Sequence, residues 1–477
     1  MGLPQAAIVG RPNVGKSSLF NWLAGRRIAI VDPTPGVTRD RLATPVQAGD
    51  RYFELVDTGG MGIEDADKLT RDVERQIDYA IDRASVILFV VDGRSGLVPL
   101  DLTAAERLRG IGKPVLLVAN KCDHPALDQQ LAEFYKLGFG DILPVSAQQS
   151  RGRTVLLERI VANLPTEVSE EPADDREPLK IAIVGRRNTG KSTFINALAQ
   201  EERTIVSEVE GTTRDSVDVA FERDGRTIIA IDTAGVRYRG SVKSDVDFYS
   251  LSRAERSIRR ADVVLHFFDA SKKASMVDKQ LAGYILDNYK PAVFVVNKWD
   301  LAKGKAFTGE YGEYLRRVFP SLEHVPIAFL TAKDGKNVQK VINLAQNLHK
   351  QAIKRAATAD LNRVVQQAVK DQSPPMRKNR VPKVYYVTQV AVHPPTIFVF
   401  TNGPDLFDKT YRRYLLKTLR DTFGFHDVPI KLYLRPKQRG EDLSKEDRLA
   451  DRAAKTIKAS RPRKDKDKEV GKLWEDV

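Results

Sequence analysis

One eight-residue pattern occurs twice in this chain and constrains its fold more than any other feature. The first copy runs from Gly10 to Ser17 and the second from Gly185 to Ser192, and both fit G-x-x-x-x-G-K-[ST]. Each follows a short apolar run and leads into an amphipathic segment, which is the strand–loop–helix context of a phosphate-binding loop. Glycines let successive backbone N–H groups face phosphate oxygens, and the helix N-terminus adds positive potential. Two copies in the same context make a chance glycine-rich turn a negligible explanation.

Four further motifs follow each loop in the same order, at or near the ends of predicted strands, where open α/β sheets bind their ligands. They are a loop threonine (Thr38, Thr213), Asp-Thr-x-Gly (from Asp57 and from Asp232), Asn-Lys-x-Asp (from Asn120 and from Asn297), and a Ser/Thr-Ala pair (Ser146-Ala147, Thr331-Ala332). The offset between the copies is 175 for the first three motifs (185 − 10, 213 − 38, 232 − 57), then 177 (297 − 120) and 185 (331 − 146). A repeat this long indicates a duplicated domain rather than a solenoid.

The alternation of β-rich runs with helical segments, together with the two phosphate loops, predicts two tandem P-loop domains of the α/β class, each a mostly parallel sheet flanked by helices. The first spans residues 1–165, with strands predicted at Ala6–Val9, Tyr52–Val56, Val86–Val91, Val115–Ala119 and Ile142–Val145. An acidic, proline-containing linker, 166–178, precedes the second domain at 179–352. Residues 355–437 read as helix–strand–strand–helix–strand, a small α+β domain similar to a KH domain but without a G-x-x-G loop. The charged tail, 438–477, is predicted to be disordered.

Bulk composition bounds the partners and the compartment. The net charge of +14 suggests an anionic partner, most simply nucleic acid, although a merely soluble basic surface stays open. Cys122 is the only cysteine, so no intramolecular disulfide can form, and a reducing compartment is expected. The sequence shows no signal peptide, and its apolar runs are too short to cross a bilayer. We therefore predict a cytoplasmic protein with no membrane partner.

The Asn-Lys-x-Asp motif predicts which base is bound. The carboxylate of Asp123 can accept two N–H bonds from guanine, whereas adenine would leave it unpaired at a high cost. We expect Asn120 to tie this loop to the phosphate loop, the Lys121 stem to cover the base, and the N–H of Ala147 to meet guanine O6. The alternative is a lysine-rich surface turn, which the ordered repeat makes improbable. Asn297, Lys298, Asp300 and Ala332 take the same roles in the second domain.

The phosphate and metal groups are predicted from the other motifs. Lys16 and Lys191 would reach the β- and γ-phosphates, and Gly60 and Gly235 would offer N–H groups to the γ-phosphate. Mg²⁺ would be held by three residues in each domain, which are Ser17, Thr38 and Asp57, and Ser192, Thr213 and Asp232. The full predicted GTP/GDP contacts in the first domain are Gly10, Arg11, Pro12, Asn13, Val14, Gly15, Lys16, Ser17, Ser18, Asp57, Thr58, Gly59, Gly60, Asn120, Lys121, Asp123, Ser146 and Ala147. In the second domain they are Gly185, Arg186, Arg187, Asn188, Thr189, Gly190, Lys191, Ser192, Thr193, Asp232, Thr233, Ala234, Gly235, Asn297, Lys298, Asp300, Thr331 and Ala332.

Turnover is expected to be slow. Ras-type GTPases place a water-orienting glutamine after Asp-Thr-x-Gly, but this chain has Met61 and Val236 there. In a subset of GTPases that this chain resembles, an asparagine at the position of Asn13 and Asn188 helps to bind K⁺ beside the phosphates. The resemblance implies K⁺-stimulated hydrolysis. The alternative role for Asn13 is a loop residue that tolerates a left-handed backbone.

With these motifs and the third domain in hand, the chain closely resembles the Der (EngA) family of bacterial tandem-G-domain GTPases over about residues 4–436. Pro382–Val390, Pro394-Pro395, Leu406-Phe407 and Phe423–Phe425 look like that family's third domain. The resemblance implies GTP-dependent assembly of the large ribosomal subunit, contact with rRNA, and nucleotide control of ribosome association, by a protein expected to be monomeric. Two alternatives stay open: a nucleotide-gated RNA-binding scaffold with incidental hydrolysis, and a tRNA-modification GTPase.

Overall fold

The computed structural model describes residues 2–25, 29–31, 42–49, 51–58, 77–78, 83–165, 178–201, 207–210, 217–223, 226–231, 251–302 and 307–437. Several predicted elements lie outside the described residues: most of the linker, the C-terminal tail and the segments after both Asp-Thr-x-Gly motifs. So do eight predicted site residues, which are Thr38, Gly59, Gly60, Thr213, Asp232, Thr233, Ala234 and Gly235.

The first domain contains a six-stranded sheet of order β3-β4-β1-β5-β6-β7. Its strands are β1 (Gln5–Val9), β3 (Leu42–Ala48), β4 (Arg51–Asp57), β5 (Val86–Asp92), β6 (Val115–Asn120) and β7 (Ile142–Pro144). Every residue of β5 is buried, because a central parallel strand is covered on both faces. All pairs are parallel except β3–β4, so the predicted, mostly parallel sheet is confirmed.

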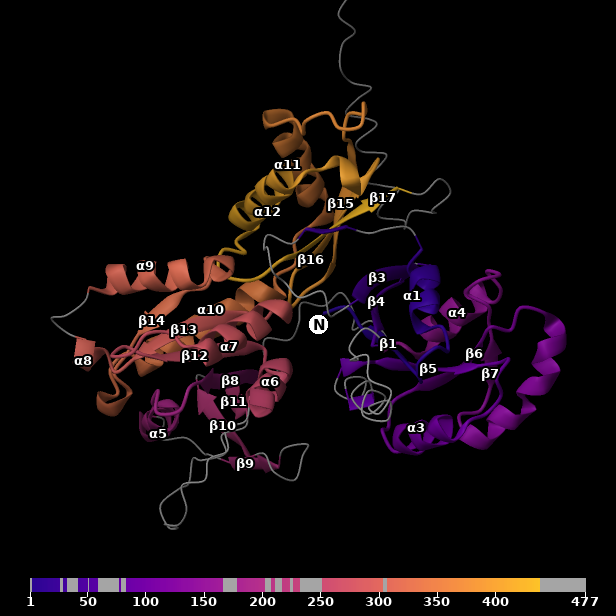
Figure 1. Cartoon of the computed structure of the whole chain (residues 1–477). Helices are drawn as coiled ribbons and strands as arrows, with labels where there is room; N and C mark the ends of the chain where they lie inside the picture. Colours follow the sequence, from indigo (N-terminus) through magenta and orange to yellow (C-terminus); the bar gives the residue numbers. More distant parts are fainter. Residues whose placement is uncertain are drawn as a thin grey trace, which may run out of the picture. The chain divides into compact units, whose positions relative to one another are not determined.

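Helices cover both faces of this sheet (Figure 1). Side chains of α1 (Lys16–Ala24) and α4 (Arg153–Asn163) pack with one face, and those of α3 (Pro99–Arg109) and the 3-10 helix η3 (Pro125–Leu137) pack with the other. Two of these elements, β3 and η3, were not predicted. Strand β3 pairs antiparallel with β4, its neighbour in the sequence, and such a direct connection does not fit the alternation of strands and helices on which the prediction rests.

The second domain repeats this plan with seven strands in the order β14-β13-β12-β8-β11-β10-β9. The strands are β8 (Leu179–Gly185), β9 (Ser207–Glu210), β10 (Val217–Arg223), β11 (Arg226–Ile231), β12 (Val263–Asp269), β13 (Ala292–Asn297) and β14 (Ile327–Phe329). One face packs with α5 (Lys191–Glu201) and α10 (Val338–Ile353), and the other with α6 (Leu251–Arg260), α7 (Met276–Asp287) and α9 (Thr308–Val318). The short elements are α8 (Trp299–Ala302), η4 (Pro320–Leu322) and η5 (Ala332–Asp334).

The third domain has the predicted order of elements: α11 (Thr358–Asp371), β15 (Val384–Ala391), β16 (Thr396–Thr401), α12 (Lys409–Phe423) and β17 (Lys431–Pro436), with η6 (Pro404–Leu406) between β16 and α12. Both helices bury apolar residues against one face of the sheet, and Phe398, Phe400 and Tyr433 cluster on the other. Strand β17 also pairs antiparallel with β2 (Ala29–Val31), which the sequence did not predict. In the part of the chain that the structure describes, no helix is long and apolar enough to span a membrane.

Candidate nucleotide-binding sites

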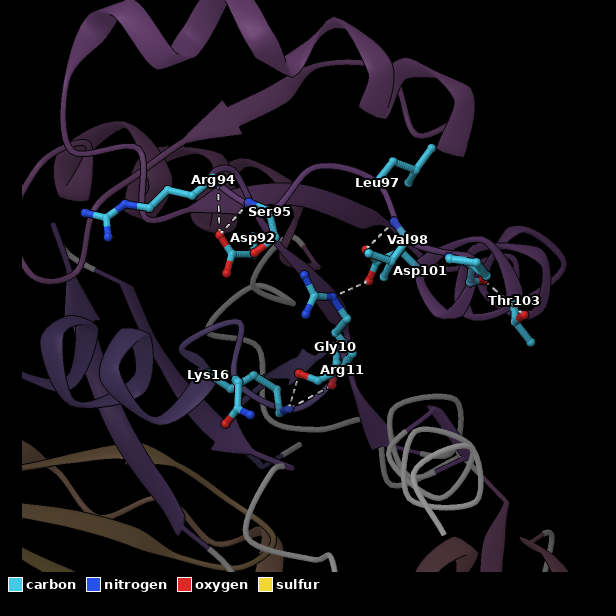
Figure 2. A network of polar contacts seen from close by, with 12 residues as sticks. Gly10, Arg11, Lys16, Asp92, Arg94, Ser95, Leu97, Val98, Asp101 and Thr103 are labelled. Atoms are coloured by element: carbon cyan, nitrogen blue, oxygen red, sulfur yellow. Dashed lines mark hydrogen bonds and ion pairs between the residues drawn. The ribbon is translucent and has the colours of Figure 1, made fainter. Parts of the chain in front are cut away.

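The phosphate-loop lysine of each domain stands at the start of the helix that follows the first strand. Lys16 Nζ donates to the carbonyl oxygens of Gly10 and Arg11, both at 2.8 Å, so the ammonium lies under the loop (Figure 2). Burial lowers the pKa of Lys16 to about 8, against the opposing influence of Asp57. Lys191 makes the two equivalent bonds at 3.0 and 2.6 Å. A bound phosphate would favour the charged ammonium.

Asn120 joins the base loop to the phosphate loop in the first domain. Its side chain is 2% exposed. Its Nδ2 donates to the carbonyl of Val14 at 2.9 Å, and its Oδ1 accepts the N–H of Ala147 at 3.3 Å. Gly15 has φ +90°, and a Cβ there would lie 2.4 Å from Asn120 Nδ2. The glycine is therefore needed for both its backbone conformation and the close approach of the asparagine.

The same tie exists in the second domain and is tighter. Asn297 Nδ2 donates to the carbonyl of Thr189 at 2.8 Å, and its Oδ1 accepts the N–H groups of Ala332 at 3.0 Å and Lys298 at 2.8 Å. The predicted contact of the alanine N–H with guanine O6 stays a prediction, because in both domains this N–H is donated to the asparagine.

Loop asparagines in both domains adopt a left-handed backbone. Asn13 has φ 66° and Asn188 has φ 60°, a conformation that asparagine tolerates better than most residues. The geometry therefore fits the structural role considered for them, and it is compatible with a cation-binding one. Lys121 and Lys298, the lysines of the base loops, have φ 67° and 60°. The two domains repeat these unusual backbone angles at equivalent positions.

The predicted guanine-binding carboxylates have different surroundings. In the first domain, Asp123 Oδ1 accepts a hydrogen bond from Ser146 Oγ at 2.6 Å, and Asp123 Oδ2 is ion-paired with Arg94. In the second domain Asp300 is exposed, and Thr331 occupies the position of Ser146. The two base sites are thus alike in sequence but not in their electrostatics.

Two aspartates that bond to the base-loop lysines were not predicted from the sequence. Asp92, at the end of β5, accepts a hydrogen bond from Lys121 Nζ at 2.7 Å, and Asp269, at the end of β12, accepts one from Lys298 at 2.8 Å. Burial would raise the pKa of Asp92, but the bonds from Lys121 and the backbone of Arg94 outweigh it, and the pKa is lowered. These aspartates fix the lysine stems expected to cover the base. Asp92 and Asp269 are 177 residues apart, as are the two Asn-Lys-x-Asp motifs, and this repeat is the sequence signal that could have identified them.

The second residue of each phosphate loop is an arginine that pairs with an aspartate of a neighbouring helix, as Figure 2 shows for Arg11 and Asp101. Arg11 Nε lies 3.4 Å from Asp101 Oδ1, and Arg186 Nε lies 2.9 Å from Asp278 Oδ2. Both aspartates also accept a backbone N–H at the start of their helices, at 3.4 Å from Val98 in the first domain and 2.7 Å in the second. The arginine side chains therefore anchor the loop to that helix, and only their backbone is placed for phosphate.

The predicted metal ligands are partly described. Ser17 Oγ donates to Asp57 Oδ2 at 2.7 Å, which brings two oxygen ligands of the kind that Mg²⁺ prefers to the end of the phosphate loop. Thr58 Oγ1 donates to the carbonyl of Ile8, so its side chain bonds to strand β1 of the sheet. Ser192 is exposed in the second domain. The donor set fits Mg²⁺.

The remaining predicted contacts lie on or next to the two phosphate loops. Thr189 Oγ1 donates to the carbonyl of Arg186 at 2.9 Å. Val14 is buried in the core, and its side chain is therefore turned away from any ligand. The other predicted contacts in this group are Pro12, Ser18, Arg187 and Thr193. Ser18 and Thr193 lie at the helix starts and Arg187 lies in the loop, and all three are exposed.

These features define a class: a P-loop GTPase with two G domains and a C-terminal α+β domain. A family model described as "50S ribosome-binding GTPase" matches residues 5–121 and 180–298, and one described as "KH-domain-like of EngA bacterial GTPase enzymes, C-terminal" matches residues 355–435. The chain belongs to the GTPase Der family.

Two relatives illustrate this. The chain is 54% identical to GTPase Der of Rhodopirellula baltica over 92% of this chain and 97% of that protein. It is 42% identical to GTPase Der of Geotalea daltonii over 91% of this chain and 98% of that protein. Among solved structures, it is similar to a probable GTP-binding protein engB, at 21% identity and a TM-score of 0.27, over 33% of this chain and 97% of that one.

Proposed function

We propose that both G domains bind GTP with Mg²⁺ and hydrolyse it slowly, and that the bound nucleotide controls association with the large ribosomal subunit through contacts with rRNA. As a member of the GTPase Der family, the protein is a GTPase that acts in large-subunit biogenesis. We propose the finer statements: Mg²⁺ in both sites, a slow rate of hydrolysis, contact with rRNA, and a monomeric, cytoplasmic protein.

The observation that carries the proposal is the duplicated tie between the base loop and the phosphate loop. In each domain one buried asparagine bonds a phosphate-loop carbonyl and the N–H of the last motif's alanine. This arrangement holds the base and phosphate subsites at a set separation. Such preorganisation lowers the cost of binding a whole nucleotide.

The chain's own residues supply most of the proposed chemistry. Lys16 would exchange its two carbonyl partners for β- and γ-phosphate oxygens, and the loop N–H groups would bind the remaining charge. When bound, Mg²⁺ would supply positive charge that offsets the negative charge of the phosphates during hydrolysis. Ser17 and Asp57 would hold it. Slow turnover follows from Met61 and Val236, neither of which can polarise water.

The proposed K⁺ role is assigned to Asn13 and Asn188. Each has a left-handed backbone and is exposed, so its side chain is not part of the core. Matched K⁺ and Na⁺ buffers test this role, and equal hydrolysis rates would reject it while leaving GTP binding intact.

The rRNA contact is proposed for a basic turn in the third domain. Arg377 and Arg380 exchange two backbone hydrogen bonds, at 3.1 and 2.9 Å, across a turn in which Lys378 and Asn379 both have positive φ. Two positive φ values are typical of a type I′ turn. The turn and the nearby Lys383 are exposed, so their charges can reach phosphates.

Ribosome association under GTP, GDP and a non-hydrolysable analogue tests the whole proposal. Sedimentation with large subunits should depend on the nucleotide. Alanine at the four basic residues should lower the salt slope of association by about 3, because each phosphate contact releases counterions. A control variant with the same charge change replaces four exposed first-domain residues, Arg107, Arg109, Lys136 and Arg159. Equal slopes in both variants would exclude the turn.

The RNA-binding scaffold alternative differs from the proposal in whether GTP hydrolysis is required. If hydrolysis is incidental, a variant that binds GTP but does not hydrolyse it should support release from the subunit as well as wild type does. Membership of the GTPase Der family, together with the two G domains, disfavours the tRNA-modification alternative.

A further inference from the structure

Arg94 stands beside the predicted guanine site of the first domain, and the second domain has a serine, Ser271, at the equivalent position. It follows β5 in a turn where Asp92 Oδ1 accepts the N–H of Arg94 at 2.9 Å. The same turn follows β12, where Asp269 Oδ1 accepts the N–H of Ser271 at 3.0 Å. Both hydrogen bonding and the 177-residue offset therefore make Ser271 the counterpart of Arg94.

The Arg94 side chain leaves this turn in the direction away from Asp92 (Figure 2) and pairs with Asp123. The side chain of Asp123 is only 6% exposed, whereas that of Arg94 is 55% exposed. The guanidinium is therefore the solvent-exposed partner of this pair, and the carboxylate is the buried one.

Guanine and Arg94 require the same acceptor atoms. Guanine would present two N–H donors to the two oxygens of Asp123. Ser146 already donates to Oδ1, and Arg94 is paired with Oδ2. A carboxylate can accept more than one bond per oxygen, so Ser146 can remain. The cation must move before the base can bind fully.

The second domain lacks this competition. The side chain of Ser271 is short, and its Oγ donates to Asp269 Oδ1 at 2.6 Å. Asp300 is exposed, and among the described residues no ion pair to it is found. Guanine can therefore approach Asp300 without displacing a cation.

We propose that Arg94 is an affinity-determining residue that competes with guanine for Asp123 and makes the two nucleotide sites unequal. The first domain then binds guanine nucleotide more weakly than it would without the arginine. Because Arg94 is more than half exposed, solvent screens its ion pair with Asp123. The arginine should therefore raise the Kd for guanine nucleotide about two- to fivefold. Raising the salt concentration weakens the pair and reduces the effect. This inference rests on the proposed guanine-binding role of Asp123.

The experiment uses the full chain and a fluorescent N-methylanthraniloyl GDP. A Lys191→Ala background silences the second site, so that titration reports the first. Arg94→Ala should lower Kd two- to fivefold, whereas the control Arg159→Ala should leave it unchanged. Arg159 is a 50% exposed arginine of the same domain, paired with an exposed aspartate. In a Lys16→Ala background, Ser271→Arg should raise Kd at the second site.

A double-mutant cycle locates the effect at the carboxylate. In an Asp123→Asn chain titrated with the xanthosine analogue, Arg94→Ala should have no effect, because asparagine cannot form the ion pair. Unchanged or weaker GDP binding by Arg94→Ala, or an equal gain in the Asp123→Asn chain, would overturn the inference. Absence of GDP binding by the parent chain would instead reject the proposed function.

Discussion

Replacing Asn120 with alanine tests the link between base and phosphate subsites. The substitution removes the bonds from Nδ2 to the carbonyls of Val14 at 2.9 Å and Gly15 at 3.5 Å and the one from the Ala147 N–H to Oδ1 at 3.3 Å. The site is 2% exposed, so water reaches the orphaned groups poorly. Each unsatisfied buried group costs about 1–3 kcal/mol. Because two of these three bonds are 3.3 Å or longer, we expect a loss of about 2–4 kcal/mol in local stability.

The repeat provides an internal comparison. Asn297→Ala removes three bonds, all between 2.8 and 3.0 Å. Its cost should therefore be larger, about 3–6 kcal/mol. Asn163→Ala is the control, because this amide donates at the surface to a helix carbonyl at 2.8 Å. Surface substitutions usually change stability by less than about 0.5 kcal/mol.

Hydrogen exchange with mass spectrometry is the assay, because a chain of several domains does not unfold as one unit. Peptides covering residues 10–18 should exchange faster in Asn120→Ala, and those covering 185–193 should not. Asn297→Ala should show the reverse, with a larger effect. Exchange in residues 10–18 that is the same for Asn120→Ala and Asn163→Ala would refute the reasoning.

Three further predictions concern single residues. His266 occupies the place of Phe89, and burial lowers its pKa, so folding stability should fall as pH drops below about 6.5. His266→Phe should remove this part of the pH dependence, and parallel pH profiles of thermal unfolding for the variant and the wild type would contradict the prediction. Gly15→Ala places a Cβ 2.4 Å from Asn120 Nδ2 at φ +90°, so GDP affinity should fall at least about tenfold; calorimetry showing wild-type affinity would argue against the close approach. Burial raises the pKa of Cys122 to about 11, so its alkylation at pH 8 should be far slower than that of a free thiol; rapid alkylation of the native protein would contradict its burial.

Much of the fold follows from local pattern. No end of a predicted first-domain strand differs from the observed end by more than one residue, because β5 and its neighbours are apolar runs bounded by polar motifs. The elements of the third domain were also predicted in the correct order. Strand β2 could not be predicted, since its pairing with β17 is a contact between residues some 400 positions apart. Such pairings depend on how the domains fold, and no local pattern encodes them.

The sequence by itself determined the two phosphate loops, the base motifs and their order. Each of these is a contiguous stretch whose backbone and side chains create its chemistry locally. The tertiary structure decided what surrounds them: the pairing of Asp92 with Lys121, of Arg11 with Asp101 and of Arg94 with Asp123. These partners meet because the parallel strand order brings the ends of β1, β5 and β6 to one edge of the sheet. An ion pair needs two charges within about 4 Å, and only the folded sheet sets that distance.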